Sequence, residues 1–516
     1  MSRTRWFAFL SGLLILAALR LAALTPSEAE VRFTIVHTND LHGKLLPFTY
    51  TERGRGAVER DTVGGAARRA SVIRRLRRLA AGPSVLVDAG DVFTRGPLTN
   101  AYEGVADVAA MNAAGYDLAA IGNNEFKARD AGDADDWRGS QAALLRVVRR
   151  SRFPWICANL TDGRGAFVRG VRPYVVKRVA GLRVGFLGVT APRSAGYPQT
   201  RGWSITDPIA AAKEWVPRVR RQCDVLIALT HIGYALDQQL AAGVDGIDAV
   251  VGGDSHTFLY EPTWATGPSG RRVPIVQDGE FGVNVGRLDL AFRRSGHGWG
   301  LAAARGELVP VVAAEPEAPD VKRALMPYVK PFLQAVGSVG DVGGDQAERA
   351  RATTSVVVRA IRRATHADLA LNPLGAGLID VFHRRVITRY DLYSAMPFAN
   401  RAVVVLMSGA DVRRVLSDQP ETVVAGDAAQ VTAGRTYRVA MADFVASSVY
   451  RVPTLRVMEQ GPDVRLAVAE YIRAAGDRTR LTRPARVTYR EEDTRVRTRP
   501  TGRRSSGAVA SAAGNA

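Results

Sequence analysis

The chain has 516 residues, of which 47% are hydrophobic and 23% charged, and these are the values of a globular protein large enough for two or three domains. They exclude a collagen, a coiled coil and a chain that is disordered throughout. The two cysteines, Cys157 and Cys223, exclude a disulfide-stapled scaffold and a thiolate zinc cluster. They leave open either free core thiols or one optional bridge. The net charge of +20 comes from arginines spread along the chain without interleaved aromatic residues, so we do not expect a nucleic-acid partner.

Residues 1–29 are predicted to be a signal peptide. Arg3 and Arg5 precede an apolar stretch, Phe7–Leu24, which Arg20 interrupts, and Ser27-Glu28-Ala29 offers a small-x-small cleavage site. The uninterrupted apolar part is short for a membrane span. We therefore expect a secreted or periplasmic protein with no stable membrane span after cleavage, and an uncleaved anchor is the alternative.

Short apolar runs alternate with helical patterns from residue 30 to residue 312. One segment, Ala66–Leu79, carries apolar residues at helical spacing among arginines. Alternating strands and helices favour a layered α/β fold with buried strands. The predicted strands are Phe33–Val36, Val85–Val87, Leu118–Ile121, Val184–Val189, Val225–Leu229 and Ala249–Val251.

The remainder of the chain is predicted to hold a second domain. Residues 313–344 have the pattern of a linker helix followed by a glycine-rich break, and residues 345–490 that of another mixed α/β domain. Residues 491–516 contain arginines followed by Ser, Gly and Ala without apolar periodicity, which predicts a disordered basic tail.

Five of the predicted strands lead into a polar cluster. Because ligands of open α/β sheets bind beyond the carboxyl ends of the strands, five such ends can converge on one place. The clusters are His37-Thr38-Asn39-Asp40-Leu41-His42, Asp88-Ala89-Gly90-Asp91, Gly122-Asn123-Asn124-Glu125, Thr230-His231-Ile232-Gly233 and Gly252-Gly253-Asp254-Ser255-His256.

Imidazole, carboxylate and carboxamide groups make up these clusters. That mixture suits hard or borderline divalent ions such as Mn, Mg, Zn or Fe, and it does not suit a metal that prefers soft thiolates. Asp40 and His42, two positions apart in an extended segment, face the same side. A single cluster would be a turn or a helix cap as readily as a site. Five in this order indicate a metal centre.

The order of the clusters resembles that of the calcineurin-like metallophosphoesterases, and within them the bacterial 5′-nucleotidase family that includes UDP-sugar hydrolases. That family has D-x-H, G-D, G-N-H-E-F-D, T-H and G-G-H-S-[HQN] motifs and a distinct C-terminal domain. The resemblance covers nearly all of the chain from Val31 to Tyr489, with further matches at Ala367–Asn372 and Met396–Asn400. It implies a layered α/β metallophosphoesterase sandwich with a second mixed α/β domain.

The resemblance also implies a pair of divalent metal ions. Matched position by position, Asp40, His42 and His256 correspond to ligands of one ion, Asp91 to the bridging carboxylate, and Asn123 and His231 to ligands of the second ion. Asp254 stands where the family has histidine; it can still bind an ion and shifts the preference toward Mn or Mg. Two ions so placed hold phosphate oxygens and supply a metal-bound hydroxide for attack.

Two departures from the family motifs bear on catalysis and on substrate recognition. Asn124 replaces the histidine that stabilises the transition state or protonates the leaving group, and Lys127 replaces its carboxylate partner. In the second domain, residues 372–378 lack an arginine of the family pattern and residues 444–450 lack its glycines. Tyr450 is a candidate for stacking on a base or for a place in the core. The catalytic role of Asn124 and the substrate-binding residues are thus open.

The sequence therefore predicts a secreted dinuclear-metal phosphohydrolase of the 5′-nucleotidase type, acting on small phosphorylated molecules. Within that class, the alternative is a general phosphatase or phosphodiesterase that is not tuned to nucleotides. From another class, the alternative is a metal-binding pseudoenzyme that binds phosphorylated ligands without turnover. The oligomeric state is open.

Overall fold

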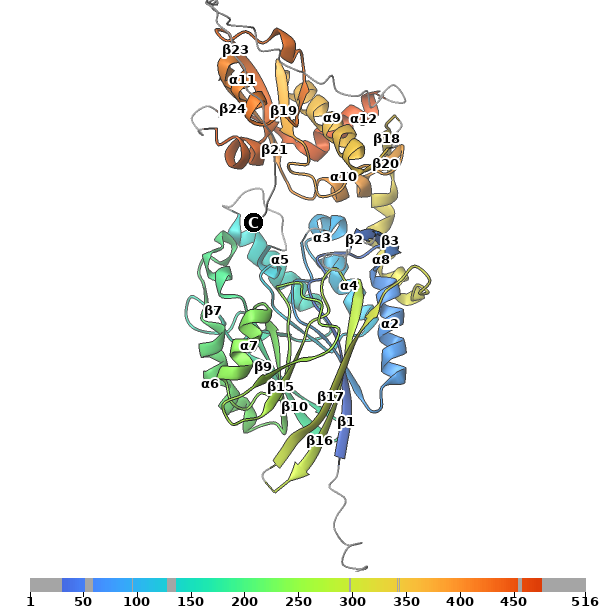
Figure 1. Ribbon diagram of the computed structural model, residues 1–516, viewed down its shortest axis with the longest axis vertical. Helices are drawn as coiled ribbons and strands as arrows, with labels where there is room; N and C mark the ends of the chain where they lie inside the picture. Colours follow the sequence, from blue (N-terminus) through green and yellow to red (C-terminus); the bar gives the residue numbers. More distant parts are fainter. Residues whose placement is uncertain are drawn as a thin grey trace, which may run out of the picture.

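The structure is a computed structural model, and it describes residues 30–51, 59–94, 96–127, 136–296, 298–340, 342, 344–452 and 457–475. The predicted signal peptide and the predicted basic tail lie outside these residues. Within the described ranges, no helix is long and apolar enough to cross a membrane. Figure 1 shows two domains stacked along the long axis of the molecule, the first coloured blue to green and the second orange to red.

A seven-stranded sheet forms one half of the first domain. Its central strands run parallel because helical crossovers join them, and a long antiparallel ribbon closes one edge. The strand order is β17 (Gly298–Pro310), β16 (Asn284–Ser295), β1 (Glu30–Thr38), β4 (Ser84–Asp88), β5 (Leu118–Ala120), β6 (Trp155–Ile156) and β8 (Val171–Arg172).

A six-stranded sheet forms the other half of the first domain. Its four central strands are parallel, so their carboxyl ends lie at one edge. The order is β14 (Thr263–Thr266), β15 (Arg272–Val276), β13 (Ala249–Val251), β12 (Val225–His231), β10 (Leu182–Thr190) and β9 (Tyr174–Val179).

The two sheets pack face to face with helices on their outer surfaces. The core between them is made of side chains such as Ile35 and Val87 from the first sheet and Phe186 and Ile227 from the second, each at most 1% exposed. The first sheet is covered by α2 (Ala66–Leu79), α4 (Val105–Ala114) and α5 (Trp137–Arg150), and the second by α6 (Pro208–Arg220) and α7 (Tyr234–Gly243). This arrangement confirms the predicted layered α/β sandwich.

The second domain is built on a five-stranded sheet that mixes parallel and antiparallel pairs. Its order is β22 (Thr422–Ala425), β19 (Leu369–Pro373), β23 (Thr436–Ala442), β21 (Arg401–Ser408) and β24 (Val457–Asp463). The helices are α9 (Gln346–Thr365), α10 (Arg389–Ala395), α11 (Gly409–Asp418) and α12 (Val464–Ala475). A mixed α/β second domain is therefore confirmed as well.

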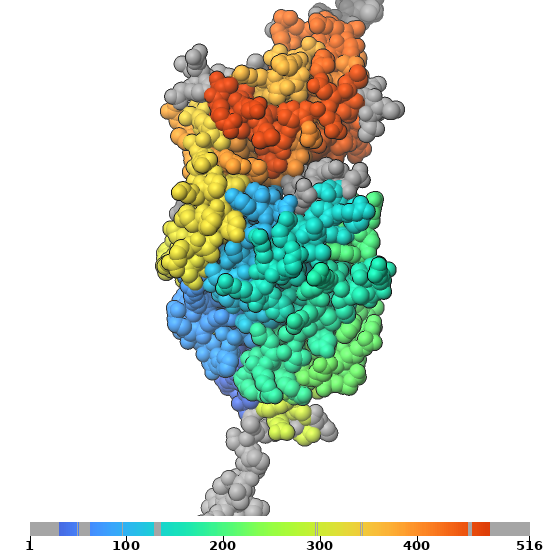
Figure 2. Space-filling model, turned by 180° about the vertical axis from the view of Figure 1, so that it is seen from behind, coloured from blue at the N-terminus to red at the C-terminus, as the bar shows by residue number. Residues whose placement is uncertain are grey.

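The predicted linker region belongs structurally to both domains. Helix α8 (Pro319–Val329) packs on α4 of the first domain, and strand β18 (Ala335–Ser338) pairs with β20 (Val386–Thr388) of the second. Seen from behind, the yellow segment that contains α8 runs from the first domain to the second (Figure 2). At the interface Asn100 Nδ2, in α3 (Pro97–Tyr102), donates to the carbonyl of Pro397 at 2.7 Å. The boundaries at residues 312 and 344 stay predictions.

Both cysteines are free and buried, which settles the alternative left open by the sequence in favour of core thiols.

The remaining short elements of the first domain are β2 (Phe48–Thr51), β3 (Glu59–Val63), β7 (Leu160–Asp162), β11 (Trp203–Ile205) and the turns η1 (Glu125–Lys127), η2 (Pro192–Gly196) and η3 (Pro198–Thr200).

Candidate metal centre

The polar clusters of the five strands meet at one place in the first domain. They come together because parallel strands present their carboxyl ends at the same edge of each sheet, and the two sheets lie face to face. Asp40 and His42 follow β1, Asp91 follows β4, Asn123 follows β5, His231 ends β12, and Asp254 and His256 follow β13.

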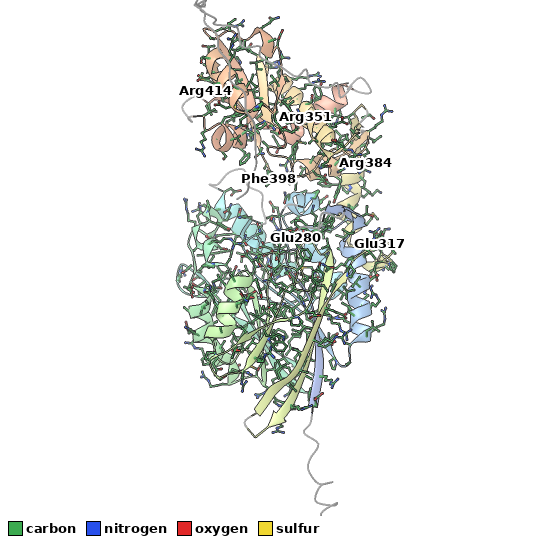
Figure 3. All side chains as sticks on the ribbon, in the orientation of Figure 1. Glu280, Glu317, Arg351, Arg384, Phe398 and Arg414 are labelled. Carbon is green, nitrogen blue, oxygen red and sulfur yellow. The ribbon has the colours of Figure 1, made fainter. Side chains whose placement is uncertain are left out.

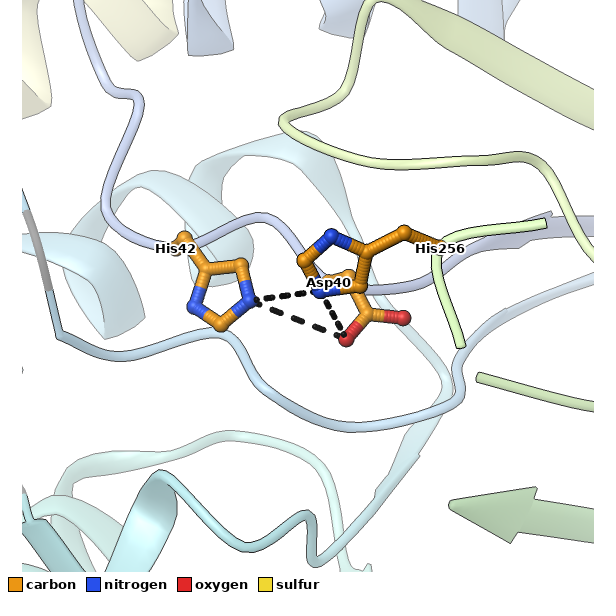
Figure 4. A group of neighbouring side chains, drawn as sticks. All are labelled: Asp40, His42 and His256. Carbon is orange, nitrogen blue, oxygen red and sulfur yellow. Dashed lines mark hydrogen bonds and ion pairs between the residues drawn. The ribbon is translucent and has the colours of Figure 1, made fainter. Parts of the chain in front are cut away.

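One group of possible ligands is formed by Asp40, His42 and His256 (Figure 4). Asp40 Oδ1 lies 3.3 Å from His256 Nε2 and 3.7 Å from His42 Nε2, and the two Nε2 atoms are 3.1 Å apart. Ligand atoms that share one ion at about 2.1 Å lie about 3 Å from each other. The three side chains therefore have a spacing that fits a single divalent ion.

A second group consists of Asp40, Asp91 and His231. His231 Nε2 lies 3.1 Å from Asp91 Oδ1 and 3.9 Å from Asp40 Oδ1. The other oxygen of Asp91, Oδ2, lies 3.7 Å from His42 Nε2 in the first group. The Asp91 carboxylate thus stands between the two groups, the position that a bridging ligand occupies.

Two buried atoms at the centre have no hydrogen-bond partner among the described residues: Asp40 Oδ1 and His231 Nε2. The opposite atom of each side chain is held, since Asp40 Oδ2 accepts from Asn39 Nδ2 and from the Asp254 amide, both at 2.8 Å. His231 Nδ1 bonds the carbonyl of Ala89 at 2.8 Å, which turns Nε2 toward the cluster. Unpaired buried acceptors of this kind, in an oxygen and imidazole donor set, fit divalent cations.

The backbone is strained where the ligand candidates lie. The angle φ is positive at Asp40 (51°), His42 (46°), Asp91 (58°), Asp254 (87°) and His256 (54°). Non-glycine residues adopt this conformation at an energetic cost, and such residues cluster at functional sites. The surrounding structure must therefore hold these loops in place.

Glu125 holds the loop that carries Asp91. Its fully buried carboxylate accepts four backbone N–H bonds, from Asp91, Val92, Phe93 and Gly122, at 2.6–3.3 Å. Gly122 itself has no room for a side chain, because a Cβ there would lie 2.3 Å from Asp91 Oδ1. This arrangement fixes the ends of β4 and β5 against each other.

The charges of the cluster shift the pKa values of its members in opposite directions. Burial lowers the pKa of His231, but the charges of Asp91 and Asp40 outweigh it and raise that pKa well above its ordinary value. Burial also opposes the charged form of His256, but the carboxylates of Asp40 and Glu280 outweigh it and raise the pKa of His256 to about 9. Burial alone would raise the pKa of Asp91, yet the neighbouring imidazoles hold it below its ordinary value. A cation at the centre is thus strongly favoured, whether as protons on imidazole or as a metal ion.

Asn123 and Asp254 are arranged around an arginine from another loop. Arg193 Nη1 donates to Asp254 Oδ2 at 2.7 Å, and Nη2 donates to Asp254 Oδ1 and, at 2.7 Å, to Asn123 Oδ1. Asp254 Oδ1 also lies 3.5 Å from His231 Nε2. These two predicted ligands of the second ion therefore lie beside the second group, and both are hydrogen-bonded to the guanidinium of Arg193.

Asn124 contacts the carboxylate of Asp91. Its side-chain amide donates to Asp91 Oδ2 at 2.5 Å, and its backbone N–H donates to Asp91 Oδ1 at 2.7 Å. Lys127 packs over the ring of Tyr197 instead, with Nζ 4.1 Å from the ring centroid. The structure thus gives Asn124 a positioning contact, and its predicted action on the leaving group stays a prediction.

Three supporting residues of the site were not predicted from the sequence. Arg193 follows β10, a strand whose end carries no metal-ligand type and was passed over, although β10 pairs in parallel with β12. Glu280, which bonds His256 Nδ1, lies in a loop after β15 that has no strand-end motif. Glu125 belongs to the Gly122–Glu125 cluster, but the sequence did not indicate that it supports the Asp91 loop. A rule that every parallel strand end deserves inspection would have found Arg193.

The second domain contains a cavity of about 920 Å³ lined by two exposed aromatic rings. Phe398 and Phe444 are each 44% exposed, and Asn400 and Asp443 line the same cavity. Figure 3 shows Phe398 on the side of the second domain that faces the first, and Glu280 at the facing end of the first domain. Tyr450 is absent from the lining; its hydroxyl lies 3.1 Å from that of Thr422, as expected of a core residue.

Comparisons with known proteins agree with this architecture. The family of calcineurin-like phosphoesterases matches residues 33–258, and that of the 5′-nucleotidase C-terminal domain matches residues 339–452. The 5′-nucleotidase of Bos taurus is 30% identical over 322 residues, which are 58% of this chain and 53% of the bovine protein. The chain thus spans about half the length of this curated relative.

Two bacterial proteins match over more of their length. A probable 5′-nucleotidase of Treponema pallidum (strain Nichols) is 25% identical over 469 residues, 77% of this chain and 76% of that protein. The crystal structure of a 5′-nucleotidase precursor from Thermus thermophilus superposes with a TM-score of 0.62 at 26% identity, covering 86% of this chain and 97% of the other. Both models match in the same order, so residues 33–258 form a calcineurin-like phosphoesterase domain and residues 339–452 a 5′-nucleotidase C-terminal domain, and the chain is similar over most of its length to 5′-nucleotidases.

Proposed function

We propose that this protein is an exported phosphohydrolase that uses two divalent metal ions to hydrolyse the phosphate ester of nucleotides. The observation that carries the proposal is the convergence of two ligand groups that share Asp40 and have Asp91 between them. Export would depend on residues 1–29. The similarity to 5′-nucleotidases supports a phosphate ester or anhydride as the substrate class.

In this proposal Asp40, His42, Asp91 and His256 hold one ion, and Asp91, Asn123, His231 and Asp254 hold the other. When bound, the ions would neutralise the phosphate oxygens and make a water molecule acidic enough to act as nucleophile near neutral pH. The donor set of carboxylates, imidazoles and one carboxamide favours Mn or Mg, with Zn or Fe also compatible.

The other residues of the site orient these groups. Glu280 bonds His256 Nδ1 and also accepts from Tyr50 Oη at 3.1 Å, so that His256 turns Nε2 to the centre. Asn124 and Glu125 hold the side chain and the backbone of Asp91 respectively. Hydrolysis needs a water oxygen to bond phosphorus while the bond from phosphorus to the leaving oxygen breaks, and this fixed frame keeps the reactants aligned for it.

Recognition of a nucleobase is assigned to the cavity of the second domain. Exposed aromatic rings are costly in water unless a flat ligand covers them, and Phe398 and Phe444 offer two such rings in one cavity. Asn400 and Asp443 supply polar groups beside them. The family arginine that residues 372–378 lack belongs to other positions than these two rings.

A kinetic comparison tests the proposal. Protein loaded with Mn²⁺ should hydrolyse AMP, and Phe398→Ala should raise KM for AMP by about tenfold or more, since stacking on one aromatic ring contributes about 1–3 kcal/mol. Hydrolysis of 4-nitrophenyl phosphate should be unaffected. Leu466→Ala, which also removes an exposed apolar side chain but lies on α12 outside the cavity, is the matched control.

The same assay separates the competing functions. If Phe398→Ala leaves KM for AMP unchanged while activated esters are hydrolysed well, the protein is a general phosphatase or phosphodiesterase. One observation favours this second candidate. The Asn124 side-chain amide donates to Asp91, so this position does not supply a proton to the leaving group. Absence of turnover on AMP, a UDP-sugar and activated aryl esters would indicate a pseudoenzyme.

A further inference from the structure

Arg193 occupies the part of the site that the second ion would need. Its guanidinium spans both oxygens of Asp254 and reaches Asn123 Oδ1. The Asp254 side chain is only 8% exposed, whereas that of Arg193 is 49% exposed. The acid is therefore fixed in the site, and the arginine approaches it from the solvent side.

The backbone also holds Asp254 in this orientation. Its φ of 87° is in the left-handed region, and its amide donates to Asp40 Oδ2 at 2.8 Å. The carboxylate consequently points to a defined place, 3.5 Å from His231 Nε2. The guanidinium of Arg193 bonds both oxygens of this carboxylate and supplies a positive charge there.

The first ligand group differs in this respect. Asp40 Oδ1, its central oxygen, accepts no hydrogen bond from an arginine or lysine within the described part of the chain, so no side-chain cation has to move away before an ion binds. Asp254, by contrast, has both oxygens bonded by Arg193. Charge-assisted bonds of this fork geometry are the stronger class of hydrogen bonds.

We propose that Arg193 competes with the second metal ion for Asp254 and Asn123, and that it makes the two ion sites unequal, one tight and one weak. The inference rests on the proposed dinuclear centre. Because the arginine side chain is half exposed, it can move into solvent when an ion takes its place. Activity would then depend on the concentration of free ion at which the second site fills.

Titration calorimetry of the metal-free full-length protein with Mn²⁺ tests this directly. The wild type should bind two ions in well-separated steps. Arg193→Met should strengthen the weaker step by about 10- to 100-fold, the range expected when hydrogen bonds to a charged group no longer oppose binding, and leave the tighter step unchanged. The exchange-coupled EPR signal of paired Mn²⁺ should appear at correspondingly lower Mn²⁺ concentration.

Two further variants complete the experiment. Arg193→Lys keeps the charge but cannot contact both oxygens, so the weaker step should fall between those of wild type and Arg193→Met, and this variant decides the matter if Arg193→Met does not fold. Arg183→Met is the matched control. It removes an arginine of similar exposure that is bidentate on Asp224 at the opposite end of β10, and it should leave both steps unchanged.

The outcomes distinguish this inference from the proposed function. Two ions bound with identical affinities in wild type and Arg193→Met would overturn the role of Arg193 and leave the dinuclear centre standing. A single ion bound by both proteins would overturn the second ion site and, with it, the role of Arg193. Absence of Mn²⁺ binding in every variant would overturn the metal centre itself, and the inference with it.

Discussion

Replacing Glu125 by glutamine should destabilise the protein, because the side chain is buried and accepts hydrogen bonds that water cannot replace. Oε1 of the carboxylate accepts from the amides of Val92 and Phe93, and Oε2 accepts from those of Asp91 and Gly122. Burial and the charge of Asp91 raise the pKa of Glu125 to about 8, while the four donors favour its charged form. A glutamine side chain keeps the shape but exchanges one oxygen for an NH₂ group.

The magnitude follows from counting the amides that lose their acceptor. Whichever way the glutamine amide turns, its NH₂ group faces two backbone N–H groups that are buried. Each unsatisfied buried donor costs about 1–3 kcal/mol, so the free energy of unfolding should fall by about 2–6 kcal/mol. That is a large part of the total for an ordinary domain, about 5–15 kcal/mol. The strained loop at Asp91 should also relax, which weakens ion binding.

Chemical denaturation of Glu125→Gln and of wild type, both metal-free, measures the effect. Glu214→Gln is the control, since Glu214 is 56% exposed and pairs with Arg218 on the surface of α6; its free energy of unfolding should change by less than about 0.5 kcal/mol. If Glu125→Gln unfolds at the same denaturant concentration as wild type, the four hydrogen bonds do not hold the loop and the reasoning fails.

Three other predictions concern protons and the leaving group. Mn²⁺ binding at neutral pH should release about two protons. The reason is that neighbouring carboxylates outweigh burial and hold the pKa of His256 at about 9 and that of His231 well above its ordinary value. Calorimetry in buffers of different ionisation enthalpy counts the released protons, and binding without proton release would contradict the prediction. Burial raises the pKa of Asp107 from 3.8 to about 7, so wild type should lose stability as pH rises through that range. Asp107→Asn should gain stability relative to wild type over the same range. If the unfolding free energies of the two proteins change with pH in parallel, the pKa of Asp107 is not raised. Asn124→His with Lys127→Asp should raise kcat/KM on alkyl phosphates relative to aryl phosphates by up to about 100-fold, because a positioned acid helps a poor leaving group most; an unchanged ratio would sink the idea.

Much of the fold was predictable because buried parallel strands are continuous apolar runs. The helix predicted at Ala66–Leu79 has those bounds in the structure, since its apolar spacing and its flanking glycine and alanine agree. The ribbon of β16 and β17 was not predicted. Strand β17, GWGLAAARGELVP, is exposed or half-buried at every residue except Gly306 and contains three glycines, so it has neither an apolar run nor a clear alternation.

The site was predictable to the extent that it follows from strand ends. The seven expected ligands all lie at the converging edges, and topology alone brings them there. What sequence could not supply is the pairing of side chains across loops. The contacts of Arg193 with Asp254 and of Glu280 with His256 join residues whose separation along the chain says nothing of their distance in space. The same is true of Phe398 and Phe444, which only the folded second domain brings to one cavity.

Crystals of the protein saturated with Mn²⁺, measured at the manganese absorption edge, test whether the site holds two metal ions. We expect two anomalous peaks on either side of the Asp91 carboxylate, one next to His42 and His256 and one next to His231. Asp91→Ala should lose one peak or both. Anomalous density that is absent from this cluster at saturating Mn²⁺ would contradict the dinuclear centre and the hydrolysis derived from it.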